Sequence, residues 1–153
     1  MMPVEPIKIL LVEDQPVDVR LTEEVMKQGK VANELYVADD GEKAMQFLRK
    51  EGEYADKPRP DLVILDLNLP RMDGKEVLQA IKTDPDLLKI PVLILTTSAA
   101  ERDVLDAYSH HVNAYITKPI DLDEFVGVVS SIEQFWLSIV RLPEGLGGGE
   151  DPR

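Results

Sequence analysis

Four short, mainly apolar runs recur along the chain, and a polar side chain closes or directly follows each of them. The runs are Ile9–Val12, Leu62–Leu65, Val92–Leu95 and Ala114–Thr117. A continuous run, without the alternation of a half-exposed strand, is typical of a strand that is covered on both faces. Together with a shorter strand at Glu34–Ala38, the pattern predicts five strands.

Between the strands, apolar residues recur at helical spacing, for example Val17, Leu21, Val25 and Met26. The predicted helices run from Pro16 to Gly29, from Asp40 to about Gly52, from Gly74 to Asp84, near Glu101–His110, and from Asp121 to about Leu142, with a loop at Glu51–Pro60. Proline in a first turn, aspartate as N-cap and glycine as stop signal support these bounds. The alternation predicts an α/β fold with a doubly wound, five-stranded parallel sheet.

Length and composition fit one acidic domain. The chain has 153 residues, of which 44% are hydrophobic, and we expect an N-terminal extension over 1–6, a domain over 7–142 and a disordered, glycine-rich tail over 143–153. The net charge of -12 argues against nucleic acid or an anionic membrane as partner. Without a leader-like start or an apolar run of about 20 residues, a cytoplasmic location is expected. The lack of cysteine excludes thiolate metal sites.

The side chains at the ends of the apolar runs are suited to binding a metal and a phosphoryl group. Glu13 and Asp14 close the first run, Asp66 the second, Thr96 the third and Lys118 the fourth. Parallel strands bring their carboxyl ends to one edge of the sheet, where ligands bind in such folds. Clustered carboxylates suit Mg²⁺, and a lysine opposite them adds a fixed positive charge. This combination is typical of phosphoryl transfer.

Asp66 is the candidate nucleophile, because it stands alone at its strand end whereas Glu13 and Asp14 come as a pair of ligands. An aspartate can attack phosphorus and form an acyl phosphate. Taken singly, an acid after a strand is more often a turn former or a helix cap. The four strand ends in register favour a site over that ordinary reading.

The sequence resembles the receiver domain of two-component response regulators over about residues 7–140. The resemblance rests on Ile9–Asp14, Asp61–Gly74 and Tyr115–Pro119, which are specific when they occur together. It implies a flavodoxin-like fold with strand order 2-1-3-4-5. It also implies that a histidine kinase phosphorylates Asp66. The protein is then a signalling phosphoacceptor rather than an enzyme, although it assists its own phosphorylation and dephosphorylation.

By the same resemblance, Mg²⁺ is held by Asp14, Asp66 and the main-chain carbonyl of Asn68. Glu13 stands where the family often has aspartate, and would hold the metal through water.

The resemblance also assigns the switch residues. Thr96 and Lys118 would bind the phosphoryl group, and Tyr115 would rotate inward on activation. The Lys118–Pro119 peptide is expected to be cis.

A narrower resemblance is to the small, cyanobacterial-type regulators that are paired with phytochrome kinases. It rests on Arg49–Tyr54, Asp66–Pro70 and Gln134–Trp136. It implies a bacterial phytochrome as the kinase partner. Since little chain follows Lys118, we expect no output domain and a separate downstream protein as the target.

Two other functions are compatible with part of the pattern. A phosphorelay intermediate would use the same acyl phosphate and pass it to a histidine on another protein. A Mg²⁺-dependent aspartyl phosphatase of the haloacid dehalogenase type needs a second acid two residues after its nucleophile, and here that residue is Asn68. Asparagine cannot protonate a leaving group, which argues against the phosphatase.

The last predicted helix has more apolar residues than one face can hold. Phe135, Ile139 and Leu142 fall on a second face, offset from the one formed by Leu122, Phe125 and Val129. An apolar patch left in water is unusual for a soluble monomer, so we predict a homodimer through this helix. The alternative is that the helix frays after Ser138 and folds back.

Overall fold

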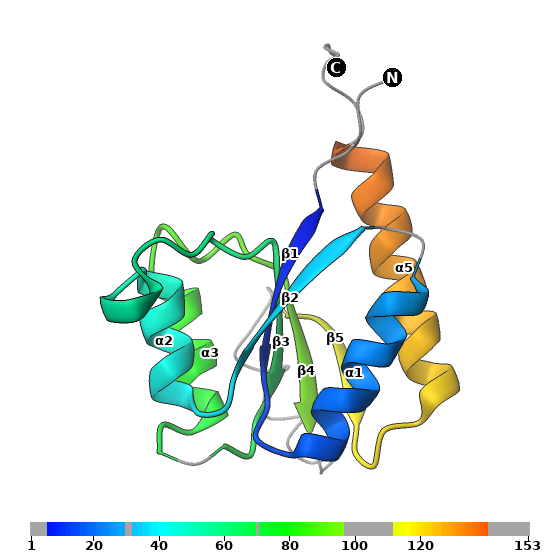
Figure 1. Cartoon of the computed structure of the whole chain (residues 1–153), viewed down its shortest axis with the longest axis horizontal. Coiled ribbons are helices and arrows are strands. Elements are labelled where there is room, and N and C mark those ends of the chain that lie inside the picture. Colours follow the sequence, from blue (N-terminus) through cyan, green and yellow to red (C-terminus); the bar gives the residue numbers. More distant parts are fainter. Residues whose placement is uncertain (1–5, 30–31, 70, 97–111, 141–153) are drawn as a thin grey trace.

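The computed structural model describes residues 6–29, 32–69, 71–96 and 112–140; in the last stretch it describes the side chains of 115–131 and 134. Five parallel strands form one sheet in the order β2-β1-β3-β4-β5. They are β1 (Ile7–Val12), β2 (Asn33–Ala38), β3 (Leu62–Asp66), β4 (Val92–Thr96) and β5 (Val112–Thr117) (Figure 1). The predicted sheet and its strand order are therefore confirmed.

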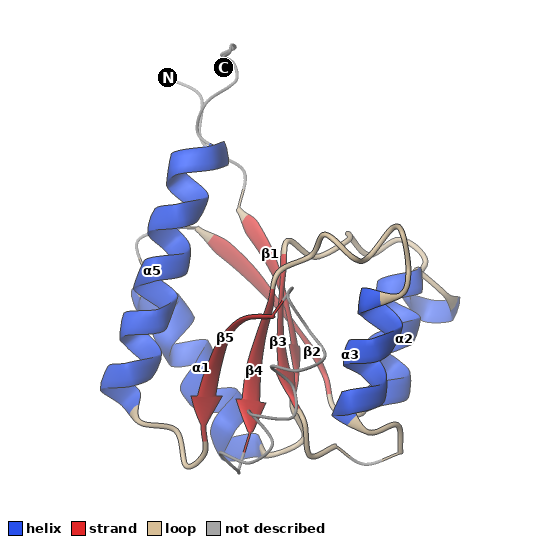
Figure 2. Cartoon of the chain, turned by 180° about the vertical axis from the view of Figure 1, so that it is seen from behind, coloured by secondary structure: helices blue, strands red, loops and turns tan. Residues whose placement is uncertain are grey.

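Helices cover both faces of the sheet. They are α1 (Pro16–Gln28), α2 (Gly41–Arg49), α3 (Gly74–Lys82) and α5 (Leu122–Val140), and a short 3-10 helix, η1, covers Gly52–Tyr54. Figures 1 and 2 show α1 and α5 together on one face and α2 and α3 on the other. The helix predicted near Glu101–His110 and the tail over 143–153 lie outside the described residues. None of the described helices combines the length and apolar character needed to span a membrane.

Alternate residues of each apolar run serve two separate cores, which explains why the runs are continuous. Leu10 and Val12 pack with α2 and α3, whereas Ile9 and Leu11 pack with α1 and α5. Each of these strands is buried on both faces, so every side chain in the run must be apolar. The polar side chains that end or follow the runs therefore lie beyond the two cores, at the edge of the sheet.

Two predictions from helical spacing are wrong. Val17 begins the apolar repeat of α1 but is 66% exposed, and Leu122 was placed toward the sheet but is 50% exposed. Both stand in the first turn of their helices, and the buried face begins later, with Thr22 in α1 and Phe125 in α5. Periodicity identifies the face of a helix, but it does not identify the turn at which the helix meets the sheet.

The predicted start signals are confirmed, and α1 ends before Gly29 as predicted. The helix α2 ends earlier than the predicted Gly52, at Arg49, because Lys50 takes a left-handed conformation. Pro16 occupies the first turn of α1, and the Asp40 side chain caps α2 by accepting a hydrogen bond from the Lys43 amide. The loop predicted at Glu51–Pro60 contains η1, whose Tyr54 ring lies 5.5 Å from that of Phe47. The loop is thus anchored to α2 rather than extended into solvent.

Candidate functional site

The five candidate side chains come to one edge of the sheet. Glu13 and Asp14 directly follow β1, Asp66 and Thr96 end β3 and β4, and Lys118 directly follows β5. Carboxylate oxygens of Glu13, Asp14 and Asp66 all lie within 4.8 Å of one another. The strand order reverses between β1 and β3, which is the position where open α/β sheets bind ligands.

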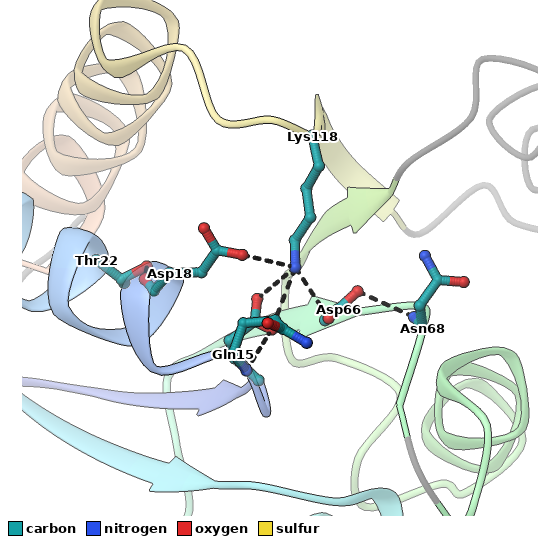
Figure 3. Close-up of polar contacts among 7 residues, drawn as sticks. Gln15, Asp18, Thr22, Asp66, Asn68 and Lys118 are labelled. Atoms are coloured by element: carbon teal, nitrogen blue, oxygen red, sulfur yellow. Dashed lines mark hydrogen bonds and ion pairs between the residues drawn. The ribbon is translucent and has the colours of Figure 1, made fainter.

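The Lys118 ammonium group lies among three carboxylates, as Figure 3 shows. Its nitrogen is 3.0 Å from Oδ2 of Asp66, 2.9 Å from Oδ2 of Asp18 and 2.9 Å from Oε1 of Glu13. The hydrogen bond to Glu13 goes to the other oxygen, Oε2, at 3.2 Å. The lysine side chain is only 11% exposed, so these contacts are shielded from water. Ion pairs that are shielded from water interact more strongly than ion pairs at the protein surface.

Asp66 is buried, and its two oxygens have different partners. Oδ1 accepts a hydrogen bond from the main-chain amide of Asn68 at 2.9 Å, while Oδ2 faces Lys118. The carboxylate is therefore fixed from two sides at this edge of the sheet. This is the geometry of a group that is positioned in advance of a reaction.

Gly74 allows the chain to turn closely beneath Asp66. A Cβ at this position would lie 2.4 Å from the main-chain oxygen of Asp66 and 2.5 Å from the Cα of Leu67. The Gly74 amide also donates to the Leu67 carbonyl at 3.2 Å. Any larger residue would push α3 away from the end of β3, so the aspartate–glycine pair at 73–74 serves packing as well as helix capping.

Glu13 is completely buried. Burial raises its pKa to about 7, and the nearby Asp66 carboxylate adds to the rise, whereas Lys118 and the Gln15 amide oppose it. Burial also acts to lower the pKa of Lys118, but hydrogen bonds to Glu13, Asp18 and Asp66 outweigh it, and the net pKa is raised. The lysine therefore stays charged, and the cluster around it carries more negative than positive charge.

The residues present fit a divalent cation. Oδ1 of Asp14 is buried and accepts no hydrogen bond within the described part of the chain. A buried carboxylate oxygen without a partner is costly, and a hard cation is a suitable one. Together with the nearby oxygens of Asp66 and Glu13, it forms an oxygen donor set of the type that Mg²⁺ or Mn²⁺ prefers.

Thr96 and Tyr115 differ in burial. Thr96 is fully buried, and its main-chain carbonyl accepts a hydrogen bond from the Lys118 amide at 2.6 Å. Tyr115 is half-buried against the core beneath α2 and α3. The Lys118–Pro119 peptide is cis, as expected. The side chains of Phe135 and Ile139, and all of Leu142, lie outside the described residues.

The sequence reading missed Asp18. This acid contacts the same ammonium group as Asp66, yet it lies in the first turn of α1 rather than at a strand end. First-turn acids are common because they complement the helix dipole, so its spacing alone does not distinguish it. The feature that could have indicated its role is its position about one helical turn after Glu13 and Asp14 in the sequence.

Comparisons with known proteins agree with this geometry. Residues 9–130 match the family model of the response regulator receiver domain, and the chain belongs to that family. It is 51% identical over 138 residues to the response regulator Rcp1 of Synechocystis sp., an alignment that covers 90% of this chain and 94% of that protein.

Solved structures give the same picture. The chain is similar to the phosphorylated cyanobacterial phytochrome response regulator RcpA, with 50% identity, coverage of 88% of this chain and 96% of that chain, and a TM-score of 0.75. It is also similar to the Mn²⁺-bound form of Rcp1, with 51% identity, coverage of 88% and 97%, and a TM-score of 0.75. The chain is thus a signalling receiver domain closely related to the phytochrome response regulators.

Proposed function

We propose that this receiver domain accepts a phosphoryl group on Asp66 from a histidine kinase in a Mg²⁺-dependent reaction, and that it signals through the resulting change in protein binding. The observation that carries the proposal is that one buried, doubly held aspartate lies close both to a shielded lysine and to Asp14, whose Oδ1 accepts no hydrogen bond within the described part of the chain. An acceptor of this kind needs a nucleophile, a fixed positive charge and oxygen ligands for a cation, and these three features supply them.

In the transfer step, an Asp66 oxygen forms a bond to phosphorus as the bond from phosphorus to the kinase imidazole nitrogen breaks. The Asn68 amide donates to Oδ1 of Asp66 at 2.9 Å and so fixes the direction of the carboxylate. Lys118 supplies a positive charge 3.0 Å from the other oxygen, where negative charge gathers on the arriving group.

Asp14, Asp66 and the Asn68 carbonyl are the proposed direct metal ligands, and Glu13 is proposed to act through water. The contacts of Glu13 support this outer role, because its Oε2 accepts from the Gln15 amide and from Lys118, and its Oε1 lies 2.9 Å from the same ammonium group. When bound, the cation would neutralise charge on the phosphoryl oxygens.

Thr96, Lys118 and Tyr115 form the proposed switch within a receiver domain over residues 7–142. A phosphoryl group offers new acceptors to the lysine and to the threonine hydroxyl at the end of β4. A packed element with two arrangements can respond to such a local change in charge. Tyr115, on the strand that leads to Lys118, is half-buried against the core, and its ring is proposed to turn inward when Asp66 is phosphorylated.

A bacterial phytochrome is the proposed kinase. The relation to Rcp1 and to RcpA, itself a phytochrome response regulator, supports this choice. The downstream partner is proposed to be another protein, because the net charge of -12 disfavours nucleic acid and anionic membranes.

The proposed homodimer uses the α5 surface, including Phe135, Ile139 and Leu142. Leu122 and Val126, one turn apart on this helix, are 50% and 41% exposed. These two residues lie on a different face of the helix from Phe135 and Ile139, so the dimer proposal rests on the apolar pattern of the helix sequence.

The proposed function is tested by incubating the protein with Mg²⁺ and acetyl phosphate and measuring its intact mass. One added phosphoryl group in the presence of Mg²⁺, and much less after chelation, is expected. Steady release of phosphate from a phosphomonoester, without a lasting mass shift, would instead indicate the phosphatase.

A further inference from the structure

We propose that Asp18 is a positioning residue for Lys118, holding its ammonium group in place before and after Asp66 is phosphorylated. This inference rests on the proposed phosphorylation of Asp66. Its starting observation is that Oδ2 of Asp18 lies 2.9 Å from the Lys118 nitrogen, with the two side chains only 20% and 11% exposed. The contact is therefore part of the shielded site rather than a surface ion pair.

The ammonium group has three N–H donors, and three different carboxylates surround it. Glu13 and Asp66 each accept a hydrogen bond, and Asp18 is the third partner (Figure 3). Phosphorylation changes only one of these, because an Asp66 oxygen becomes the bridging oxygen of an acyl phosphate and the carboxylate charge is lost. The arriving phosphoryl oxygens can accept the donor that Asp66 gives up, while Glu13 and Asp18 keep the other two.

Asp18 is available for this role because Glu13, and not Asp18, accepts the hydrogen bond from the N-cap amide of α1. In α3, the acid three residues after the N-cap, Glu76, accepts from the N-cap amide of Asp73 at 3.0 Å. In α1 the equivalent acid is Asp18, but the N-cap amide of Gln15 donates to Glu13 at 3.1 Å instead. The Asp18 carboxylate is thus turned from capping its own helix toward Lys118.

The backbone of Asp18 is also fixed. The hydroxyl of Thr22 donates to the Asp18 carbonyl at 2.8 Å, and Thr22 is completely buried. A fixed first turn therefore presents the carboxylate to the long lysine side chain. Contact with Asp18 restricts the conformational freedom of that side chain before the phosphoryl group arrives, so less entropy is lost during transfer.

A rival effect is plain charge repulsion, in which Asp18 would oppose an arriving dianion whether or not Lys118 is present. The two effects differ in sign and in their dependence on the lysine. Positioning predicts slower phosphorylation without Asp18, and only when Lys118 is present. Repulsion predicts faster phosphorylation in either background.

The first experiment observes Lys118 directly in the metal-free, unphosphorylated protein. The ¹⁵N–¹H signal of its ammonium group, assigned by its absence in Lys118→Ala, should be visible at low temperature in the wild type, because all three donors are bound. Asp18→Asn should broaden it beyond detection, and Glu42→Gln, which removes a first-turn acid from α2 on the opposite face, should not. An unchanged signal in Asp18→Asn, in a protein whose amide spectrum shows it folded, would refute the positioning role.

The second experiment is a double-mutant cycle on the rate of phosphorylation by acetyl phosphate at saturating Mg²⁺. Asp18→Asn should slow the wild type by about 10 to 100-fold, the cost of misplacing a catalytic group by about 1 Å. In the Lys118→Ala background the same change should alter the rate less than about twofold. Equal slowing in both backgrounds, or faster phosphorylation, would overturn the proposal. Failure of the wild type to accept phosphate would instead reject the proposed function, and the ammonium signal would still decide whether Asp18 fixes Lys118.

Discussion

The ammonium nitrogen of Lys118 lies 3.0 Å from Oδ2 of Asp66, although 52 residues separate them in the sequence. Asp66 ends β3 and Lys118 directly follows β5, and these strands are not neighbours, since β4 lies between them. Adjacent strands are about 4.8 Å apart, so the lysine must reach past the end of β4. Thr96, the last residue of β4, therefore lies between the two strand ends, and its carbonyl accepts from the Lys118 amide.

Gly74 should be needed for the close packing beneath Asp66. A Cβ there would overlap the Asp66 carbonyl oxygen, so Gly74→Ala should lower the free energy of unfolding by about 1 to 3 kcal/mol. Gly127→Ala is the matched control, since a Cβ at Gly127 meets nothing within 4 Å and alanine favours a helix interior by about 0.5 to 1 kcal/mol. Urea unfolding of both variants measures the difference, and equal effects would contradict the packing role of Gly74.

Divalent cation affinity should depend more on Asp14 than on Glu13. Asp14 and Glu13 each have a buried oxygen that accepts no hydrogen bond within the described residues. In Glu13, however, that oxygen lies 2.9 Å from the Lys118 ammonium group, and the other oxygen accepts from two donors. Loss of an outer ligand typically costs about 10 to 100-fold in affinity, and Asp14→Ala should cost more than Glu13→Ala. Calorimetric titration with Mg²⁺ measures the order, and a larger loss in Glu13→Ala would contradict it.

The metal-free protein should lose stability as the pH rises from about 4.5 to about 7. Burial, with help from Asp66, raises the pKa of Glu13 from 4.5 to about 7, so the folded state binds this proton more tightly than the unfolded state. The stabilisation is fully present below about 4.5 and is lost as the pH passes about 7. In chelator-treated protein, Glu13→Gln should show a shallower decline in the free energy of unfolding across this window. Parallel curves for the two proteins would refute this assignment.

Pairing through α5 should be visible in solution. Sedimentation at micromolar concentration should give twice the monomer mass of 17.2 kDa, and Phe135→Glu combined with Ile139→Glu should halve it. Val37→Glu, which adds a charge at an exposed apolar site on β2, serves as the control. A wild-type monomer both with and without phosphorylation would exclude the dimer.

Strand ends were the most predictable feature of this chain. Continuous apolar runs mark strands buried on both faces, so the acids, threonine and lysine that end or follow them could be placed at one edge before the structure was known. Asp18 could not, because its position in a first turn has an ordinary helical explanation. The burial of Thr22 in place of Val17 was also unpredictable, since it depends on where α1 meets the sheet and on the hydrogen bond to Asp18.

Phosphorylation of Asp66 itself is tested most directly by intact mass measurement of wild type and Asp66→Asn after incubation with Mg²⁺ and acetyl phosphate. Asparagine keeps the shape of the side chain but removes the nucleophilic carboxylate. The wild type should gain one phosphoryl group and Asp66→Asn none, with both proteins folded by their amide spectra. Equal labelling of Asp66→Asn would contradict the assignment of Asp66 as the phosphoacceptor.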